Sequence, residues 1–356
     1  EARGLVTVRF ESGAEVLADV WRGNDPVWLA RAVELARRED AVIVAESVCR
    51  LIRSPWFDPR AGPNDLFGGV VNEDFVGTKL ISHGLVRPGS AAPPGWSEQF
   101  AERVIDVVLP GYAVFTPEDL RIAAARLLHE GSVRIKSPWD AGGLGQHVVA
   151  SLADLEPLIE QAGPGPWLED GFVVERNLEE VATVSVGQVA LEGIRASYVG
   201  RQRLTRNHDG VWVYGGTDLL CTPGGLDTLR QLPLTGDQRL AVEQARCYHD
   251  EALQCFPNTY ASRANYDVAQ GRDAGGRWYS GVLEQSWRIG GASAAEVEAV
   301  GALLAHPARR AVWAATRESY DPREPVPSDA KIVFHGEDAQ AGFLLKYVRT
   351  KRSAGT

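Results

Sequence analysis

Two neighbouring segments in the second half of the chain restrict its fold more than any other feature. Residues 279–284 alternate apolar with polar side chains after a turn signal at Gly275 and Gly276, which predicts a β-strand entered through a turn. Residues 262–269 predict the partner strand. The resulting hairpin carries one carboxylate on each strand, Asp267 and Glu284.

These two carboxylates, with Ser286 and Arg288 beyond them, suit a magnesium site. Carboxylate and hydroxyl oxygens are ligands that Mg²⁺ accepts, and the arginine is then left for a phosphate group. Two ordinary ion pairs on a sheet explain the same residues, because surface carboxylates are common and magnesium sites have loose spacing rules. The residues alone leave both interpretations open.

The composition is that of an ordinary globular protein. With 356 residues, 44% hydrophobic and 24% charged, the chain is long enough for two or three domains that each bury a core. Its formal net charge of -10 argues against broad binding to nucleic acid or anionic membranes, although a local basic cleft can still hold nucleotide phosphates. No apolar run approaches the roughly 20 residues that span a bilayer.

The cysteine pattern indicates a reducing compartment. The four cysteines form no C-x-x-C pair, so they suggest neither a zinc site nor a disulfide framework. The first residues lack the apolar core of a signal peptide. We therefore expect a cytoplasmic protein.

Residues up to about 75 alternate strand and helix signals. Strands are expected over 5–10 and 41–45, the second of them buried and parallel, with a helix over 26–38 between them. No G-x-G-x-x-G motif follows a strand, so this small α/β layer is not expected to bind a dinucleotide. A helix over about 77–85 then carries Lys79.

Thr116 and Pro117 mark a strong helix start. Thr116 is a good N-cap residue, Pro117 fits the first helical position, and Asp119 adds a negative charge in the first turn. The helix should run to His129 and stop at Gly131.

A glycine-rich loop follows between two short strands. Residues 133–136 predict a strand that ends in Lys136, and 148–150 resume as a strand. The loop over 137–146 is therefore a hairpin tip rather than the strand-to-helix loop of a P-loop protein. Its backbone N–H groups and Lys136 suit phosphate oxygens, whereas a plain flexible hairpin is the commoner meaning of such a loop taken alone.

The rest of the chain predicts an antiparallel sheet with two helices. Expected strands cover 171–178, 183–189, 194–200 and 211–214, the last turning at Gly215 and Gly216. Helices are expected from Thr235 or Asp237 to about Phe256 and over 294–304, and the end is expected to be frayed from Arg349.

The order of these motifs resembles the ATP-grasp superfamily over about 79–293. Those proteins run a lysine-bearing helix, a helix that starts with proline, a strand with a second lysine, a glycine-rich flap, an E-x-x-hydrophobic hinge strand, an Asp strand and an E-x-N-x-R strand. The matching residues here are Lys79, Thr116-Pro117, Lys136, Gly142-Gly143-x-Gly145, Glu175-Arg176-Asn177-Leu178, Asp267 and Glu284-Gln285-Ser286-Trp287-Arg288. The fuller wording around Asp267 and Glu284 is similar to a bacterial branch of that superfamily.

The resemblance implies an ATP-grasp fold of mixed α+β and α/β class. A small N-terminal α/β domain would cover 1–110 and a lid subdomain 111–175. A C-terminal antiparallel-sheet domain at 176–356 would then hold ATP, metal and substrate.

The resemblance also implies which residues bind ATP. Lys79 and Lys136 would contact the α- and β-phosphates, with Lys136 also serving catalysis. The flap with Gly142, Gly143 and Gly145 would close over the β- and γ-phosphates. In the hinge, the Glu175 side chain and the backbone of Arg176 and Leu178 would bind adenine. Either Glu179 or Glu180 would bind the ribose hydroxyls.

For the metal, the resemblance implies Asp267, Glu284 and Ser286 as ligands of one or two Mg²⁺. Arg288 would act in catalysis by stabilising charge on the transferring phosphoryl group. Ser286 stands where the superfamily usually has asparagine, and its hydroxyl is a weaker oxygen donor.

The implied reaction activates a carboxylate as an acyl phosphate at the expense of ATP, and an amine or thiol then attacks. The alternatives are an ATP-dependent phosphotransferase of the same fold and a nucleotide-binding protein without turnover. Expected cofactors are ATP and Mg²⁺. Expected partners are small-molecule carboxylates, amines or thiols and a second copy in a homodimer, but not nucleic acid or a membrane.

Other residues are open to two interpretations. Arg201, Arg203 and Arg206, with the segment 214–217, suit a carboxylate substrate through bidentate contacts, but a solvated sheet face explains the three arginines slightly better. Trp287 is either a core residue or a pocket wall.

Overall fold

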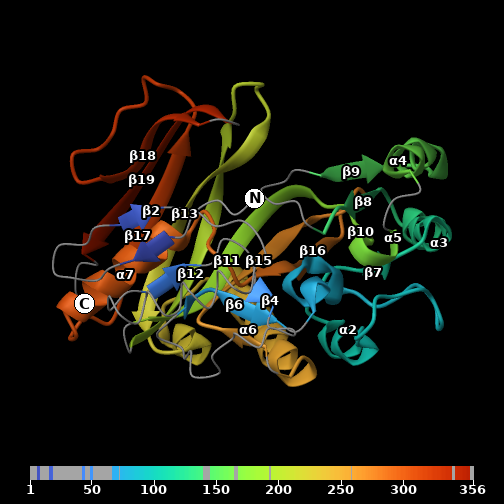
Figure 1. Cartoon of the computed structure of the whole chain (residues 1–356), viewed down its shortest axis with the longest axis horizontal. Helices are drawn as coiled ribbons and strands as arrows, with labels where there is room; N and C mark the ends of the chain where they lie inside the picture. The colour runs from blue at the N-terminus through green and yellow to red at the C-terminus, as the bar shows by residue number, and fades with distance from the viewer. Residues whose placement is uncertain are drawn as a thin grey trace.

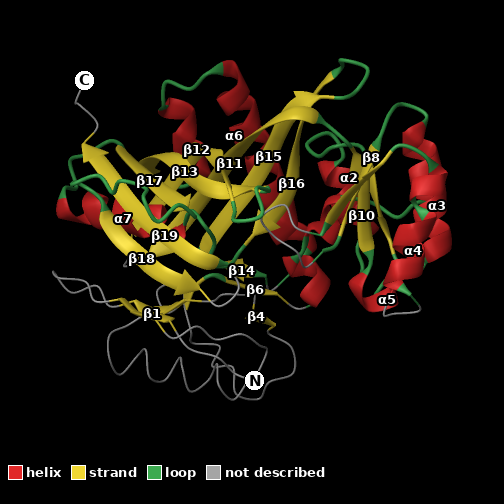
Figure 2. Ribbon diagram, turned by 90° about the horizontal axis from the view of Figure 1, so that it is seen from above, coloured by secondary structure: helices red, strands yellow, loops and turns green. Residues whose placement is uncertain are grey.

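The computed structural model describes residues 66–352, apart from positions 72, 139–144, 164–166, 192–193, 258 and 339–340, together with four short strands nearer the N-terminus. The described chain is α+β and is built mainly on antiparallel sheets. An eight-stranded sheet forms the larger body, and a four-stranded sheet with its own helices lies beyond one end of it (Figure 1, Figure 2).

The larger sheet, here called the central sheet, has the strand order β16-β15-β11-β12-β13-β17-β19-β18, and its strands are all antiparallel to their neighbours. The strands are β11 (Glu179–Leu191), β12 (Ile194–Arg206), β13 (Trp212–Pro223), β15 (Arg263–Arg272), β16 (Trp278–Ser286), β17 (Val312–Ser319), β18 (Lys331–Asp338) and β19 (Gly342–Arg352). The antiparallel sheet expected in the second half is thus confirmed.

Helices cover both faces of the central sheet. One face packs Val184, Val199 and Val268 against α6 (Gly236–Cys255). The other packs residues such as Leu219 against α7 (Ser293–Ala305). Successive residues of a strand point to opposite faces, so the residues between these apolar positions line the α7 side. The α6 helix starts as expected, with Thr235 as its N-cap in a capping box with Gln238.

Residues before the four-stranded sheet complete the core on the α6 side. They form the 3-10 turns η1 (Asp74–Gly77) and η2 (Lys79–Ser82) and the helix α2 (Glu98–Val104). The expectation of one helix over 77–85 is wrong, because Thr78 is extended (φ -117°, ψ 168°) and separates the two turns. Phe75, Leu80 and Phe100 join the cluster of apolar side chains that α6 forms with the sheet.

The smaller sheet, here called the lid sheet, has the order β7-β10-β8-β9. Its elements are β7 (Gly111–Val114), α3 (Pro117–Leu128), β8 (Val133–Lys136), β9 (Gln146–Val149), η3 (Leu152–Asp154), α4 (Glu156–Ala162), α5 (Trp167–Asp170) and β10 (Phe172–Arg176). The expected start of α3 is confirmed, since the Thr116 hydroxyl accepts a hydrogen bond from the Asp119 N–H at 3.1 Å. β8 and β9 pair antiparallel, so the expected hairpin is also confirmed.

Short strands near the N-terminus, together with β14 from the second half of the chain, form two further sheets. They are β1 (Val6–Val8), β2 (Val16–Ala18), β3 (Val42–Val44) and β5 (Leu66–Phe67) in the order β2-β1-β3-β5, and β4 (Cys49–Arg50), β6 (Gly69–Val71) and β14 (Tyr260–Ala261) in the order β14-β6-β4. The expected strands at 5–10 and 41–45 contain β1 and β3. β3 pairs parallel with β5, as expected, but antiparallel with β1. The helix expected over 26–38 lies outside the described residues.

Two expectations for the central sheet are wrong. The chain does not turn at Gly215 and Gly216, because β13 continues through both and absorbs them in a register shift against β12. The end is not frayed from Arg349, because β19 runs on to Arg352 paired with β17. A last 3-10 turn, η4 (Leu226–Gln231), precedes α6.

Candidate functional site

A cavity of about 950 Å³ lies between the central sheet and the lid sheet. Its wall includes strands of both sheets and the loop that leads into α7. The expected site residues that line it are Lys79, Lys136, Glu175, Arg176, Leu178, Asp267, Glu284, Ser286 and Arg288. Residues more than 200 positions apart in the sequence, such as Lys79 and Arg288, therefore meet at one cavity.

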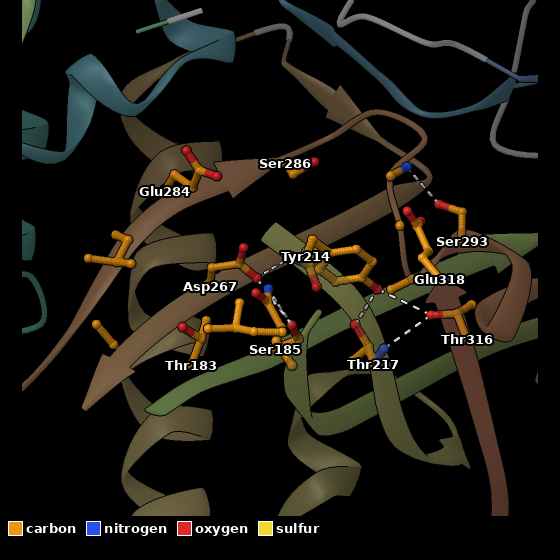
Figure 3. Close-up of a pocket in the computed structure, with 18 of the residues that line it drawn as sticks. Thr183, Ser185, Tyr214, Thr217, Asp267, Glu284, Ser286, Ser293, Thr316 and Glu318 are labelled. Carbon is orange, nitrogen blue, oxygen red and sulfur yellow. Dashed lines mark hydrogen bonds between the residues drawn. The ribbon is translucent and has the colours of Figure 1, made fainter. Parts of the chain in front are cut away.

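Asp267 and Glu284 lie directly opposite each other on β15 and β16. A register shift follows at once, since the next pair is Val268 with Val282 and Leu283 is left without a partner on β15. This β-bulge decides which way Glu284 points. Val282 belongs to the core on the α6 side, and strict alternation would send Glu284 to that same side. With the bulge, Glu284 faces the cavity beside Asp267 (Figure 3).

Polar side chains of its own strand and of the neighbouring strand β11 hold the Asp267 carboxylate. Its Oδ1 accepts hydrogen bonds from Asn265 Nδ2 at 2.8 Å and Ser185 Oγ at 3.2 Å. Gln202 donates to the Ser185 hydroxyl from β12 at 3.1 Å. Burial and the nearby Glu284 charge raise the pKa of Asp267, and these hydrogen bonds only partly oppose the rise. The ionised form of Asp267 would therefore be favoured by a further positive charge close to it.

Lys79 is the nearest cation to this acidic pair. Its Nζ lies 3.1 Å from Glu284 Oε2 and donates to the Ser137 carbonyl at 3.3 Å, although the side chain is only 4% exposed. Gln285 fixes the turn that carries Lys79, because its amide donates to the carbonyls of Val76 at 2.8 Å and Thr78 at 2.6 Å. The strand that presents Glu284 on one face thus positions Lys79 from its other face.

Lys136 is the second buried lysine of the cavity, and it contacts Glu175. The two side chains make a short ion pair on the paired strands β8 and β10, and both are almost fully buried. His83 Nε2 lies 3.5 Å from the other oxygen of Glu175. Burial acts to raise the pKa of Glu175, but the charges of Lys136 and His83 outweigh it and hold the pKa at about 2. The carboxylate that was expected to bind adenine is thus engaged with Lys136 and lies beside His83.

Arg263 anchors the segment that follows Glu284. It forms a two-pronged ion pair with Glu296 of α7, at 2.6 and 2.9 Å, and both side chains are fully buried. Its Nη1 also donates to the carbonyl of Arg288 at 2.6 Å and to the hydroxyl of Ser286 at 3.2 Å. The expected third metal ligand, Ser286, therefore faces the cavity while it accepts a hydrogen bond from a guanidinium.

Leu178, from the segment expected to be the hinge, contributes to an apolar slot beside the lid sheet. Leu178 packs with Leu109 and Ala269, next to Leu283, and all four line the cavity. The Arg176 guanidinium turns away toward Glu130 at 2.9 Å and Asp273 at 3.4 Å, so this hinge residue is fixed by protein contacts.

The two residues that were candidates for binding the ribose do not lie at the cavity wall. Glu179 and Glu180 are exposed, and neither is among the described residues that line the cavity. Glu180 nevertheless has a left-handed backbone (φ 50°), which is uncommon for a residue other than glycine.

Of the glycines expected in the flap, Gly142 and Gly143 lie outside the described residues. Gly145 is left-handed (φ 59°), and its carbonyl closes the hairpin by accepting from the Ser137 N–H at 3.0 Å.

The structure shows where Trp287 and the arginines of β12, which the sequence left open to two interpretations, lie. Trp287 is fully buried in the core, where its indole N–H donates to the Tyr266 hydroxyl at 3.0 Å. Arg203 pairs with Asp218, and Arg206 stacks over Trp212 with its guanidinium carbon 4.4 Å from the ring centroid. These arginines do not line the cavity, because the alternating positions Gln202 and Leu204 do.

Several cavity residues were not expected from the sequence. Thr183, Ser185 and Thr316 supply hydroxyl groups and Glu318 a further carboxylate (Figure 3), and Asn265 supplies an amide. Tyr214 and Thr217, from the segment expected at the substrate pocket, also line the cavity. Each sits on a strand at a position where a polar residue is also normal on a solvated face. Only the pairing of strands distant in sequence reveals that they share one wall.

The acidic pair fits a single magnesium ion with nucleotide phosphates better than a metal cage made by protein alone. Within the described ranges, no group of three or more His, Cys, Asp or Glu side chains is placed to hold a metal. Mg²⁺ is usually bound through one or two carboxylates with waters and substrate phosphates as the other ligands. The negative charges of Asp267 and Glu284 are what such an ion would neutralise.

The features above define an α+β protein in which an acidic pair and two buried lysines face one cavity between two antiparallel sheets. The chain belongs to the family described as "Protein of unknown function (DUF3182)", whose model matches residues 60–348. No curated protein matches the sequence significantly. Among the helices of the described chain, none is long and apolar enough to cross a bilayer.

Two solved structures are similar at low sequence identity. Phosphoribosylamine–glycine ligase from Thermotoga maritima is 15% identical, with a TM-score of 0.48 over 87% of this chain and 80% of that chain. D-alanyl-alanine synthetase A from Vibrio cholerae is 14% identical, with a TM-score of 0.33 over 59% of this chain and 58% of that chain. Both likenesses are too distant to support a conclusion about the fold or the activity of this chain.

Proposed function

We propose that this chain is an ATP-dependent ligase of the ATP-grasp type, which activates a carboxylate as an acyl phosphate for attack by an amine or thiol. The observation that carries the proposal is the placement of Asp267 opposite Glu284 in a cavity that Lys79 and Lys136 also line. Like charges directly opposite on paired strands are destabilising, so a cation bound between them at the cavity wall would relieve the repulsion.

The proposed nucleotide would lie with its adenine in the apolar slot of Leu109, Leu178 and Leu283. Its triphosphate would extend toward the acidic pair, where Lys79 and Lys136 neutralise phosphate charge. Asp267 and Glu284 would hold Mg²⁺, which when bound supplies further charge neutralisation for phosphoryl transfer. Arg288 would stabilise charge on the transferring phosphoryl group.

Both lysines that would bind phosphate are already paired with carboxylates. Lys136 is paired with Glu175, and Lys79 with Glu284. A phosphate bound at Lys79 would compete with Glu284 for its ammonium group, and Mg²⁺ would compensate Glu284 in its place. The binding of ATP and of Mg²⁺ should therefore be cooperative.

ADP release is the direct test of the proposed function. The full chain is incubated with ATP, MgCl₂ and pools of carboxylic acids, amines and thiols, and ADP is measured by a coupled assay. We expect release that depends on the pools and that Glu284→Ala abolishes, with Glu284→Gln as a second variant that keeps a hydrogen-bond acceptor for Lys79. Normal turnover in both variants would exclude the proposed metal site.

A matched control separates chemistry from folding. Glu102 is an exposed carboxylate on α2, so Glu102→Ala should leave both ADP release and the unfolding midpoint unchanged. Circular dichroism of Glu284→Ala should give the spectrum of the unmodified chain. If Glu284→Ala loses both activity and structure, it does not test the metal site. The ADP release of Glu284→Gln then decides whether the proposal stands.

One observation favours a second candidate, a nucleotide-binding protein without turnover. Ser286 accepts a hydrogen bond from Arg263, which makes it a poor ligand for a second magnesium ion. Thermal stabilisation by ATP and Mg²⁺ reports binding to the native state alone. If that stabilisation survives Asp267→Ala and Glu284→Ala and no pool elicits ADP release, the second candidate replaces the first.

A further inference from the structure

The far end of the cavity holds a third carboxylate, Glu318, which no motif of the sequence indicates. It lies on β17, one of the last strands of the chain, and lines the cavity with Thr217 and Thr316. Figure 3 shows Tyr214 between Asp267 and Glu318, so the two carboxylates flank one aromatic ring. Burial is the largest cause of the raised pKa of Tyr214, and the charges of Glu318 and Asp267 raise it further.

The Glu318 carboxylate is only half satisfied. Its side chain is 11% exposed, and its Oε1 lies 3.3 Å from Lys346 Nζ on the paired strand β19. No hydrogen bond from a residue that the structure describes reaches its other oxygen, Oε2. Burial raises the pKa of Glu318 although Lys346 opposes the rise. A carboxylate in this state gains from a second hydrogen-bond donor that carries positive charge.

The Tyr214 ring is fixed at this end of the cavity. Its hydroxyl forms hydrogen bonds with the Thr217 hydroxyl at 2.5 Å and the Thr316 hydroxyl at 3.1 Å. On its other side the ring packs on Gly291, where a Cβ atom would lie 2.3 Å from the ring. The fixed Tyr214 ring thus stands between the acidic pair and the end of the cavity that holds Glu318, here called the subsite (Figure 3).

We propose that Glu318 binds the nucleophilic substrate, and that this substrate is a primary amine that arrives as an ammonium ion. This inference rests on the ligase function proposed above and decides between the amine and the thiol. An ammonium group is attracted by Glu318 and can donate to Oε2. A thiolate is repelled by the same carboxylate, and because it is the thiolate that attacks, a thiol substrate gains nothing from the site.

The subsite also prepares the amine for attack. The ammonium ion gives one proton to Glu318, whose pKa is raised by burial although Lys346 opposes the rise, so this carboxylate accepts a proton more readily than an exposed one. The nitrogen lone pair then forms a C–N bond with the acyl carbon. The bond from that carbon to the phosphate oxygen breaks, and inorganic phosphate leaves with the electron pair and takes the second N–H proton. Glu318 acts on the substrate itself and is thus a catalytic residue in this scheme.

Hydroxylamine provides a probe that separates activation from amine recognition, because it attacks acyl phosphates and is uncharged at neutral pH. The full chain is incubated with ATP, MgCl₂ and the pooled carboxylic acids, with either hydroxylamine or pooled primary amines as nucleophile. Hydroxamate, amide and ADP are then measured. In Glu318→Gln we expect hydroxamate formation to be unchanged and amide formation to fall about 100-fold, the usual weight of a proton-transfer group.

The outcomes distinguish this inference from the ligase function. Equal effects of Glu318→Gln on hydroxamate and amide, or transfer by the unmodified chain to thiols but not to amines, would overturn the amine subsite and leave the ligase intact. An absence of ADP release and hydroxamate in the unmodified chain would overturn the ligase and the subsite together. Glu324→Gln, an identical change in an exposed loop, should alter neither product, and the unfolding midpoint of each variant controls for folding.

Discussion

Asp267 and Glu284 face the same cavity only because Leu283 is bulged out of register between their two strands. The bulge turns a polar residue from the α6 core side to the cavity side and sets two carboxylates opposite each other. Bulges of this kind commonly redirect a side chain beside an active site. The arrangement stores like-charge repulsion that a bound cation would relieve, and several measurable consequences follow.

The first prediction concerns the repulsion between these carboxylates. Asp267→Asn should raise the free energy of unfolding at neutral pH by about 0.5 kcal/mol in the absence of Mg²⁺, because a like-charge pair across two strands is removed. The folded-state pKa of Asp267 lies above its unfolded value, so this carboxylate lowers stability as pH rises from about 4 through the folded-state pKa. Urea unfolding as a function of pH measures both effects. Asp209→Asn, in an exposed turn, should change neither, and a destabilised Asp267→Asn at neutral pH would contradict the assignment.

The second prediction concerns the buried ion pair of Arg263 and Glu296. Arg263→Met should destabilise the chain by about 3–5 kcal/mol, because it leaves the Glu296 carboxylate buried without its partner. The double variant Arg263→Met with Glu296→Leu should recover most of that loss. Urea unfolding measures the stabilities. ADP release should stay low in the double variant, since Arg263 also holds the backbone of Ser286 and Arg288; a fully active double variant would show that this contact is dispensable.

The third prediction compares two glycines near α7. Gly291→Ala places a Cβ against the Tyr214 ring and should destabilise by about 1–3 kcal/mol, as overpacking does, while reducing ADP release. Gly301 lies within α7, where a methyl group added at its Cα would meet nothing within 4 Å, so Gly301→Ala should stabilise by about 0.5–1 kcal/mol. Thermal unfolding of the two variants measures the contrast. Equal effects of the two substitutions on stability would mean that the Tyr214 ring moves aside without an energetic cost.

The fourth prediction concerns His249 of α6, which is 7% exposed between Gln188 and Tyr266. Burial first, and then the charge of Arg195, lower its pKa from 6.5 to about 4. The unfolded chain therefore binds a proton that the folded chain does not, and stability should fall by roughly 3 kcal/mol as pH drops from 6.5 to 4. In His249→Gln, the free energy of unfolding should fall by roughly 3 kcal/mol less over the same pH range. An unchanged slope would show that His249 is protonated in the folded chain.

Much of the secondary structure was predictable because its signals are local. The N-cap at Thr116, the capping box at Thr235 and the alternation in β15 and β16 each depend on a few neighbouring residues. The errors occurred where tertiary contacts outweigh local preference. Thr78 separates two turns that Gln285 holds from a distant strand, and Gly215 and Gly216 lie within a strand because β17 extends the sheet beyond β13.

The candidate site was predictable in part. Motif order indicated Lys79, Lys136, Asp267 and Glu284, all of which line one cavity. It did not indicate that Glu175 is paired with Lys136, since β8 and β10 are not consecutive and their pairing register is a tertiary property. Glu318 carries no motif at all, and only the place of β17 in the sheet brings it to the cavity wall.

The sequence by itself determined the kinds of element, the antiparallel character of the second half and the chemical groups available for a nucleotide and a metal, because these depend on residues near one another in the chain. Only the tertiary structure decided which of those groups meet. A strand exposes each side chain to one of two faces, and a single bulged residue exchanges the faces for everything beyond it. The position of Glu284 depends on that exchange, and no local pattern in the sequence records it.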